Sequence, residues 1–191
     1  DWEMLILEPD VQRQADAAAL AEKYPQVFMD GRALERVAGK HVPLYISEAE
    51  PEHGGIRSFL PDHHADGVAL TTSVGELCQG QGWDAVDLLS MNAPGVDKDI
   101  LEHLALSGLR PRVISCAFNE SWAQQLGYGV PELVALLQRW GYSTLISEWH
   151  PRYDGGERCW HRLYAPSRQL PAAGGWGHLI ATLSEPGFAR L

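Results

Sequence analysis

Cysteine is scarce in this sequence, with three residues among 191 and no C-x-x-C pair. Cys78, Cys116 and Cys159 are widely spaced and odd in number, which excludes a disulfide framework of the kind that holds small secreted domains together. Cysteines that stay reduced are typical of the cytoplasm, so we expect the protein to be cytoplasmic.

Long apolar runs and basic clusters are also missing. No apolar run approaches about 18 residues, so the sequence predicts no transmembrane helix and no membrane partner. The formal net charge is −10, and Lys and Arg are not clustered on any expected helix. A negative field of this size repels a phosphate backbone, so we do not expect nucleic acid as a partner.

Short apolar segments alternate with helical patterns along most of the chain. Strands are expected at residues 2–8, 27–29, 42–47, 86–91 and 112–118, with a closing antiparallel pair at 142–149 and 177–183. Helices are expected at residues 11–23, 96–107 and 131–140. Strands that alternate with helices form right-handed βαβ units. The pattern therefore predicts an α/β fold with a mostly parallel sheet, in one domain over residues 1–191.

Two segments interrupt this alternation. Residues 48–67 are polar and predict a long loop, which in a compact domain often serves as a lid or contacts substrate. Residues 150–175 predict an irregular segment in which Tyr153, Trp160 and Tyr164 lie close in sequence to Arg152, Arg158, Arg162 and Arg168. These aromatic side chains could stack on a sugar or grip an anionic acceptor, or they could cover the edge of the sheet.

Candidate binding residues follow the expected strands, because ligands of open α/β sheets bind beyond the carboxyl ends of the strands. Glu8 follows the first strand, where a carboxylate can accept two hydrogen bonds from a ribose diol, or can be a solvated acid. Asp30 and Gly31 follow the second strand, where they could meet an adenine ring or could form only a turn. Asn92 follows the strand that we expect near the centre of the sheet, and Asp97 lies in the helix after it.

Other polar residues are weaker candidates. His63 and His64, in the long loop, could contact substrate or act as an acid and base pair, or could be two solvated histidines. The spacing of Glu148 with His150, and of Cys159 with His161, matches no standard zinc pattern, so we predict no metal site.

Several motifs in order give the chain a family resemblance. The segment LEPD at residues 7–10 resembles a ribose-binding "FEPdp" strand end, and DLLSMNAPGVDKDIL at 87–101 is similar to "iDllKiDvEGaEldvL". The segments SVGEL at 73–77 and WGHLIA at 176–181 resemble "TLDeL" and "WGNLIA". These motifs belong to the FkbM-type S-adenosylmethionine methyltransferases, which the sequence resembles over most of its length.

The resemblance implies a Rossmann-like class I methyltransferase fold and S-adenosylmethionine as cofactor. It implies O-methylation of a hydroxyl on a sugar or natural product, so the partner would be a small-molecule or glycan acceptor. In that arrangement Glu8 is on the ribose side, Asp30 and Gly31 are on the adenine side, and the acceptor lies over residues 92–97.

The sequence also departs from the family. The family's first strand and its glycine-rich turn, which holds the methionine part of the cofactor, would precede Trp2 and are missing. That strand lies between those that end at Glu8 and Met91 here, and its loss would leave buried backbone groups unpaired at about 1–3 kcal/mol each. Either these two strands pair with each other, or another segment, domain or chain supplies the missing one.

The second signature is altered as well. Ser90, Asn92 and Pro94 replace the lysine, aspartate and glutamate of the family pattern. An amide cannot take a proton from a hydroxyl near neutral pH, so Asn92 is not a general base. A second hypothesis is therefore a degenerate, non-catalytic methyltransferase-like module that acts in binding or scaffolding. A third is a sugar-modifying accessory domain that uses the aromatic segment.

Overall fold

The computed structural model describes residues 2–50, 53–149, 160–171 and 174–183. The chain divides into two compact units, Asp1–Leu77 and Cys78–Leu191, and each is considered by itself. A single domain over the whole chain stays a prediction.

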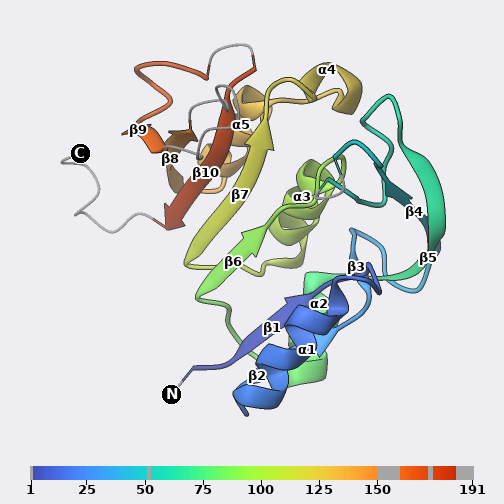
Figure 1. Ribbon diagram of the computed structural model, residues 1–191. Coiled ribbons are helices and arrows are strands. Elements are labelled where there is room, and N and C mark those ends of the chain that lie inside the picture. Colours follow the sequence, from blue (N-terminus) through green and yellow to red (C-terminus); the bar gives the residue numbers. More distant parts are fainter. Residues whose placement is uncertain (1, 51–52, 150–159, 172–173, 184–191) are drawn as a thin grey trace. The chain divides into compact units, whose positions relative to one another are not determined.

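The first unit contains five strands and one complete helix in its described residues, shown from blue to green in Figure 1. They are β1 (Met4–Leu7), α1 (Gln14–Lys23), β2 (Val27–Asp30), β3 (Ala33–Leu34), β4 (His41–Ile46) and β5 (His64–Thr72). Helix α2 (Val74–Gln81) runs across the boundary between the two units.

Strands β1 and β2 form a parallel pair that α1 connects. Met4 lies opposite Val27 and Leu7 lies opposite Asp30, so both strands end at the same edge. The β-branched and aromatic residues of these strands favour extended backbone, whereas the alanine-rich sequence of α1 favours a helix. The expected strand, helix and strand are confirmed, although α1 begins at Gln14 rather than at residue 11.

Strands β3, β5 and β4 form a second sheet, with β5 in the middle. β5 is antiparallel to β4 and parallel to β3. The predicted loop over residues 48–67 is therefore too long, because residues 64–67 already belong to β5. The side chains of His64 and Asp66 are polar and exposed and Gly67 has none, so this segment gives no hydrophobic strand pattern. Backbone pairing with β4 makes this segment a strand.

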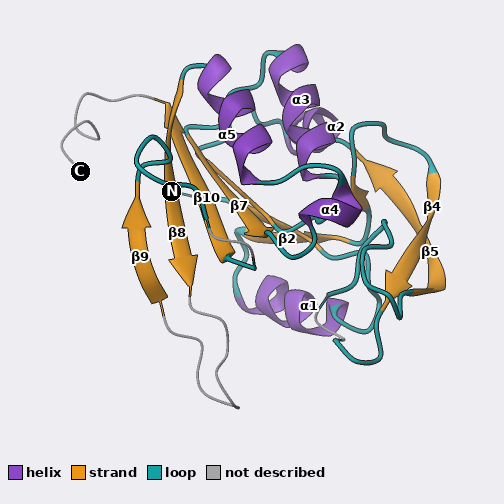
Figure 2. Ribbon diagram, turned by 90° about the horizontal axis from the view of Figure 1, so that it is seen from above, coloured by secondary structure: helices purple, strands orange, loops and turns teal. Residues whose placement is uncertain are grey.

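The second unit contains β6 (Leu88–Met91), α3 (Asp97–Ser107), β7 (Val113–Asn119), α4 (Ala123–Leu126), α5 (Val130–Arg139), β8 (Tyr142–Trp149), β9 (Trp160–Tyr164) and β10 (Trp176–Leu183). Its five strands form one sheet in the order β6-β7-β10-β8-β9. α3 and α5 lie on one face of that sheet (Figure 2). The expected helices at 96–107 and 131–140 and the antiparallel pairing of β8 with β10 are confirmed.

The core of the second unit lies between this sheet and its two helices. Leu101 of α3, Leu137 of α5, and Ile146 and Leu179 of the strands have no exposed surface. Burying a side chain of this size stabilises the fold by about 1.5–3 kcal/mol. Only one face of the sheet is buried in this way, because its opposite face carries no fully buried strand residue among those described.

The predicted Rossmann-like, mostly parallel sheet is wrong. The described strands form three small sheets of two, three and five strands, and four of the seven strand pairings are antiparallel. β10 inserts antiparallel between β7 and β8, and β9 arises from a segment that was expected to be irregular. Among the described strands, β1 pairs only with β2 and β6 pairs only with β7. How the outer edges of these two strands are completed stays a prediction. None of the helices in the described part of the chain is long and apolar enough to cross a membrane.

The end of α3 offers a test of local backbone chemistry. Gly108 caps α3 in the left-handed conformation with φ of 77°, and a Cβ there would meet no atom within 4 Å. Gly108→Ala should therefore cost about 1 kcal/mol of unfolding free energy, because alanine is strained at positive φ. Urea unfolding measures it. Gly75→Ala in α2, which also has open space but no positive φ, should cause no loss, and an equal loss in both variants would contradict the explanation.

Candidate functional site

Two of the predicted binding positions lie side by side at the carboxyl end of the β1–β2 pair. The backbone amide of Glu8 donates to the carbonyl of Asp30 at 3.1 Å, and Gly31 follows directly. Because the two strands are parallel and in register, the side chain of Glu8 and the backbone of Gly31 share one edge. The first unit thus brings together the ribose-side and adenine-side residues that the sequence predicted.

The Glu8 side chain is partly exposed and has one oxygen available. Its Oε1 accepts the backbone amide of Asp10 at 2.9 Å, which holds the carboxylate in place. No hydrogen bond among the described residues engages its Oε2. A carboxylate held by one oxygen and open at the other can accept a hydroxyl donor from a ligand.

Asp30 is engaged much more fully than Glu8. The guanidinium of Arg32 donates to both Asp30 oxygens, from Nε at 3.0 Å and from Nη2 at 2.7 Å. These hydrogen bonds lower the pKa of Asp30 below its usual value, and Arg32 also reaches Glu76 at 3.3 Å. A carboxylate with this bidentate partner is a poor acceptor for an adenine amino group, because the ligand would have to displace Arg32.

Gly31 lies against the first residue of α1. A Cβ at this position would lie 2.8 Å from Nε2 of Gln14, the far end of a flexible side chain that can move aside. The same Nε2 donates to the carbonyl of Glu8 at 2.9 Å, so Gln14 holds the end of β1 against the start of α1. No hydrogen bond among the described residues uses the backbone amide of Gly31, which is exposed.

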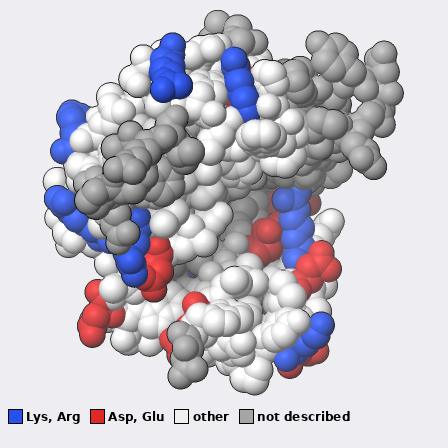
Figure 3. Space-filling view, turned by 90° about the vertical axis from the view of Figure 1, so that its left-hand side faces the viewer, with Lys and Arg blue, Asp and Glu red and all other residues white. Residues whose placement is uncertain are grey.

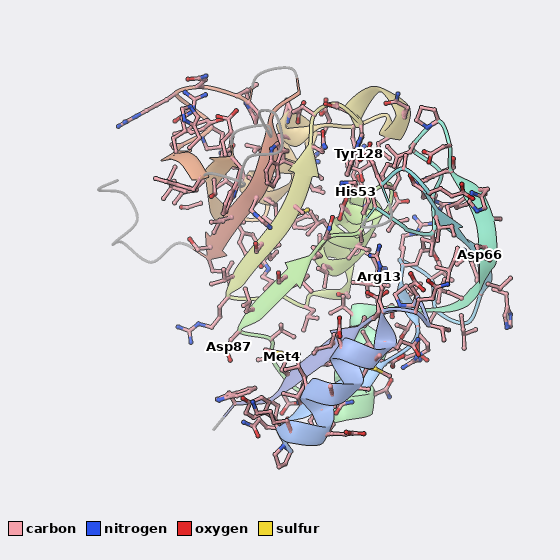
Figure 4. All side chains as sticks on the ribbon, viewed as in Figure 1. Met4, Arg13, His53, Asp66, Asp87 and Tyr128 are labelled. Atoms are coloured by element: carbon pink, nitrogen blue, oxygen red, sulfur yellow. The ribbon has the colours of Figure 1, made fainter. Side chains whose placement is uncertain are left out.

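A second cluster lies in the loop after β6. Asn92 is exposed, whereas Asp97 is only 4% exposed. The backbone amide of Ala93 donates to Asp97 Oδ1 at 3.0 Å, and the hydroxyl of Tyr128, the residue labelled in Figure 4, donates to Oδ2 at 3.2 Å. The Tyr128 oxygen in turn accepts the amide of Gly95 at 2.9 Å. Asp97 and Tyr128 therefore hold the loop by the backbone amides of Ala93 and Gly95, and these four residues form a cluster that we call the clasp.

Burial raises the pKa values of two acidic groups at this clasp, the Asp97 carboxyl and the Cys116 thiol. Loss of solvent raises the pKa of Asp97 to about 6, although the Ala93 amide and the Tyr128 hydroxyl favour the ionised form. The thiol of Cys116 is fully buried, and burial together with the nearby Asp97 carboxylate raises its pKa. The cluster is thus a buried acid with a structural hydrogen-bond network and not a solvent-facing base.

The two loop histidines differ from each other. Nδ1 of His63 accepts the backbone amide of Phe59 at 3.1 Å, and Nε2 lies 2.9 Å from the carbonyl of His53, to which it therefore donates. Both ring nitrogens of His63 are hydrogen-bonded to the backbone of its own loop, so neither nitrogen is left for acid–base chemistry. His64 is exposed and begins β5.

The C-x-H and E-x-H residues do not form a metal site among the described residues. Glu148, 5% exposed, accepts Arg162 Nε at 2.8 Å and the Tyr164 hydroxyl at 3.1 Å, both at its Oε2. His150 and Cys159 lie outside the described residues. No group of three or more potential metal ligands occurs in the part of the chain that the structure describes.

On the face shown in Figure 3, basic side chains stand beside acidic ones at several places.

Two residues of these clusters, Tyr128 and Arg32, were not identified from the sequence. Tyr128 lies 31 residues from Asp97 and carries no motif, so only the packing of the segment before α5 on the β6 loop brings it in. Arg32 was not among the candidate residues, yet it neutralises Asp30; an acid two residues from an arginine after a strand is a usable signal for such a pair.

No protein-family model, no curated protein and no solved structure matches this chain.

Proposed function

We propose that this chain is methyltransferase-like and that its first unit binds the adenosine part of S-adenosylmethionine, for O-methylation of a hydroxyl on a sugar or natural product. The observation that carries the proposal is the pairing of an open carboxylate oxygen on Glu8 with the exposed amide of Gly31 on the neighbouring strand. A ribose diol needs an acceptor and a purine ring nitrogen needs a donor, and the two groups supply these on one edge.

The fit of the cofactor to these residues is uneven. Glu8 fits a ribose, and the Gly31 amide fits a purine nitrogen, but the Asp30 carboxylate is held by Arg32 and contributes only through that ion pair. When bound, the cofactor would supply a sulfonium methyl group for in-line transfer, and the task of the protein would be to align the acceptor. Glu8 would hold the ribose, and Gln14 would hold the backbone of Glu8 against the start of α1.

The direct test is calorimetric titration of the chain with S-adenosylmethionine and, separately, with adenosine. Both should bind, and Glu8→Gln should weaken both by roughly tenfold or more, because a charge-assisted hydrogen bond to the ribose is worth about 1.5–3 kcal/mol. Glu3→Gln, before the opposite end of β1, is the matched control and should bind as the parent does. Absence of binding by both ligands up to about 1 mM, or equal losses in the two variants, would contradict the proposal.

A second candidate function is a non-catalytic binding or scaffolding module. It is favoured by the engagement of the residues that could act on an acceptor, since His63 uses both nitrogens and Asp97 is buried in its clasp. In this function the module no longer binds the cofactor, so a chain that binds neither S-adenosylmethionine nor adenosine would support it over the first.

Under either candidate function, the open edges of β6 and β1 leave room for a partner strand. The backbone groups of Leu88 and Ser90 on the outer edge of β6, and those of Leu5 on the outer edge of β1, have no partner among the described residues. Open edges of this kind pair readily with an added strand. We propose that another domain or chain supplies it.

A further inference from the structure

Three tryptophans form one row across neighbouring strands of the five-stranded sheet. The register places Trp149 of β8 opposite Trp160 of β9 on one side and opposite Trp176 of β10 on the other. Successive side chains of a strand alternate between faces, and Ile146 and Leu179 point to the helix-covered face. The indole row therefore lies on the opposite face, at the end of the sheet where β8 stops and β10 starts.

The row is held in a defined arrangement. The rings of Trp149 and Trp176 stack with their centroids 5.8 Å apart and an interplanar angle of 26°. The indole nitrogen of Trp160 donates to Oγ of Ser147 at 3.2 Å, so this ring is tethered although 56% of the residue is exposed. An exposed indole that is fixed in orientation presents a broad apolar surface at little cost in side-chain entropy.

The described strand positions beside the row carry polar, uncharged side chains. Asn119 lies beside Trp176 and His178 lies beside Ser147 in the strand register. Burial lowers the pKa of His178, so its ring is neutral at physiological pH. Among the described strand positions on this face there is no Lys, Arg, Asp or Glu, although charged residues make up 21% of the chain.

We propose that the row of Trp160, Trp149 and Trp176 binds the pyranose rings of a neutral glycan. A pyranose presents C–H groups from the face of its ring, which suit the negative face of an indole, and hydroxyl groups from its rim, which suit Asn119, Ser147 and His178. The lack of charge at the described strand positions of this face, in a chain of net charge −10, opposes anionic ligands and nucleic acid. The binding does not depend on the proposed function.

Titration of the full chain with neutral hexasaccharides of β-linked glucose, mannose and xylose tests the proposal, with tryptophan fluorescence and calorimetry as readouts. No cofactor is added, so failure here is separate from failure of cofactor binding. At least one hexasaccharide should bind, and Trp160→Ala should weaken its binding by at least tenfold, or about 1.4 kcal/mol, with an unchanged melting temperature. Ser147→Ala should weaken it by a smaller factor, because the tether is lost while the ring remains.

Trp2→Ala is the matched control, because Trp2 is also 56% exposed but lies outside the row. It should leave glycan affinity unchanged. The proposal is overturned if no neutral hexasaccharide binds up to about 10 mM, if Trp160→Ala binds as the parent does, or if Trp2→Ala loses the same affinity. It is also overturned if the chain dimerises in sedimentation experiments and Trp160→Ala abolishes the dimer, since the row would then serve association between copies.

Discussion

Gly177→Ala should destabilise the protein by at least about 4 kcal/mol, the largest effect that we expect from a single substitution. Gly177 lies within β10, where the strand passes very close to β8. A Cβ at this position would overlap the carbonyl oxygen of Ser147 and stand 3.0 Å from its carbon and 3.1 Å from Cα of Glu148. All three atoms belong to the backbone of β8, so no side chain can rotate away to relieve the clash.

Denaturant unfolding, followed by tryptophan fluorescence, measures this loss. Because β10 is hydrogen-bonded to both β7 and β8, displacing it separates the sheet into parts, and the variant should unfold cooperatively at much lower urea. Gly108→Ala in the same unit is the control, because it also replaces a glycine at positive φ but meets no atom within 4 Å. A Gly177→Ala variant within about 1 kcal/mol of Gly108→Ala would show that β10 can shift without cost.

Asp97 should make the protein less stable as the pH rises from about 4 to about 7, relative to Asp97→Asn. Burial raises the pKa of Asp97 to about 6 in the folded protein, against an ordinary value of 3.8. Below about pH 4 both states hold the proton. Between these values the unfolded chain releases it first, so folding stability falls through this window and levels off above the folded pKa. The difference corresponds to about 3 kcal/mol.

Unfolding free energies of the parent and of Asp97→Asn, measured in urea from about pH 4 to about pH 7.5, test this linkage. The asparagine keeps an acceptor for the Ala93 amide and offers its amide to the Tyr128 oxygen, but it does not ionise. Asp99→Asn, in the same turn of α3 and only partly buried, should leave the pH profile of the parent unchanged. A parent and an Asp97→Asn variant with parallel profiles would mean that water or a rearrangement relieves the buried charge.

Much of the local structure could be predicted from the sequence, because it depends on neighbouring residues. The helix at 131–140 was expected from proline near its start and glycine after its end, and α5 spans Val130–Arg139 with Gly141 at φ of 85°. β1, β2, β6 and β7 follow from short apolar runs. β5 and β9 were missed because their side chains are mostly exposed, and exposed strands are recognised by backbone pairing and not by hydrophobic pattern.

The candidate site shows the same division. Glu8 lies beside Asp30 and Gly31 because two parallel strands of similar length end at one edge, while the binding roles of these residues stay predictions. The engagement of both nitrogens of His63 depends on a side-chain conformation that no spacing reveals. The clasp of Asp97 by Tyr128 needs a contact across 31 residues.

The sequence by itself determined where most strands and helices form and which polar residues follow them, since hydrophobic periodicity, helix ends and turn residues act over a few positions. Only the tertiary structure decided how the strands pair. The antiparallel insertion of β10, the division into three sheets and the alignment of Trp149, Trp160 and Trp176 depend on hydrogen bonds between segments far apart in the chain. Several pairings can satisfy the same local pattern, and the packing of the whole core selects among them.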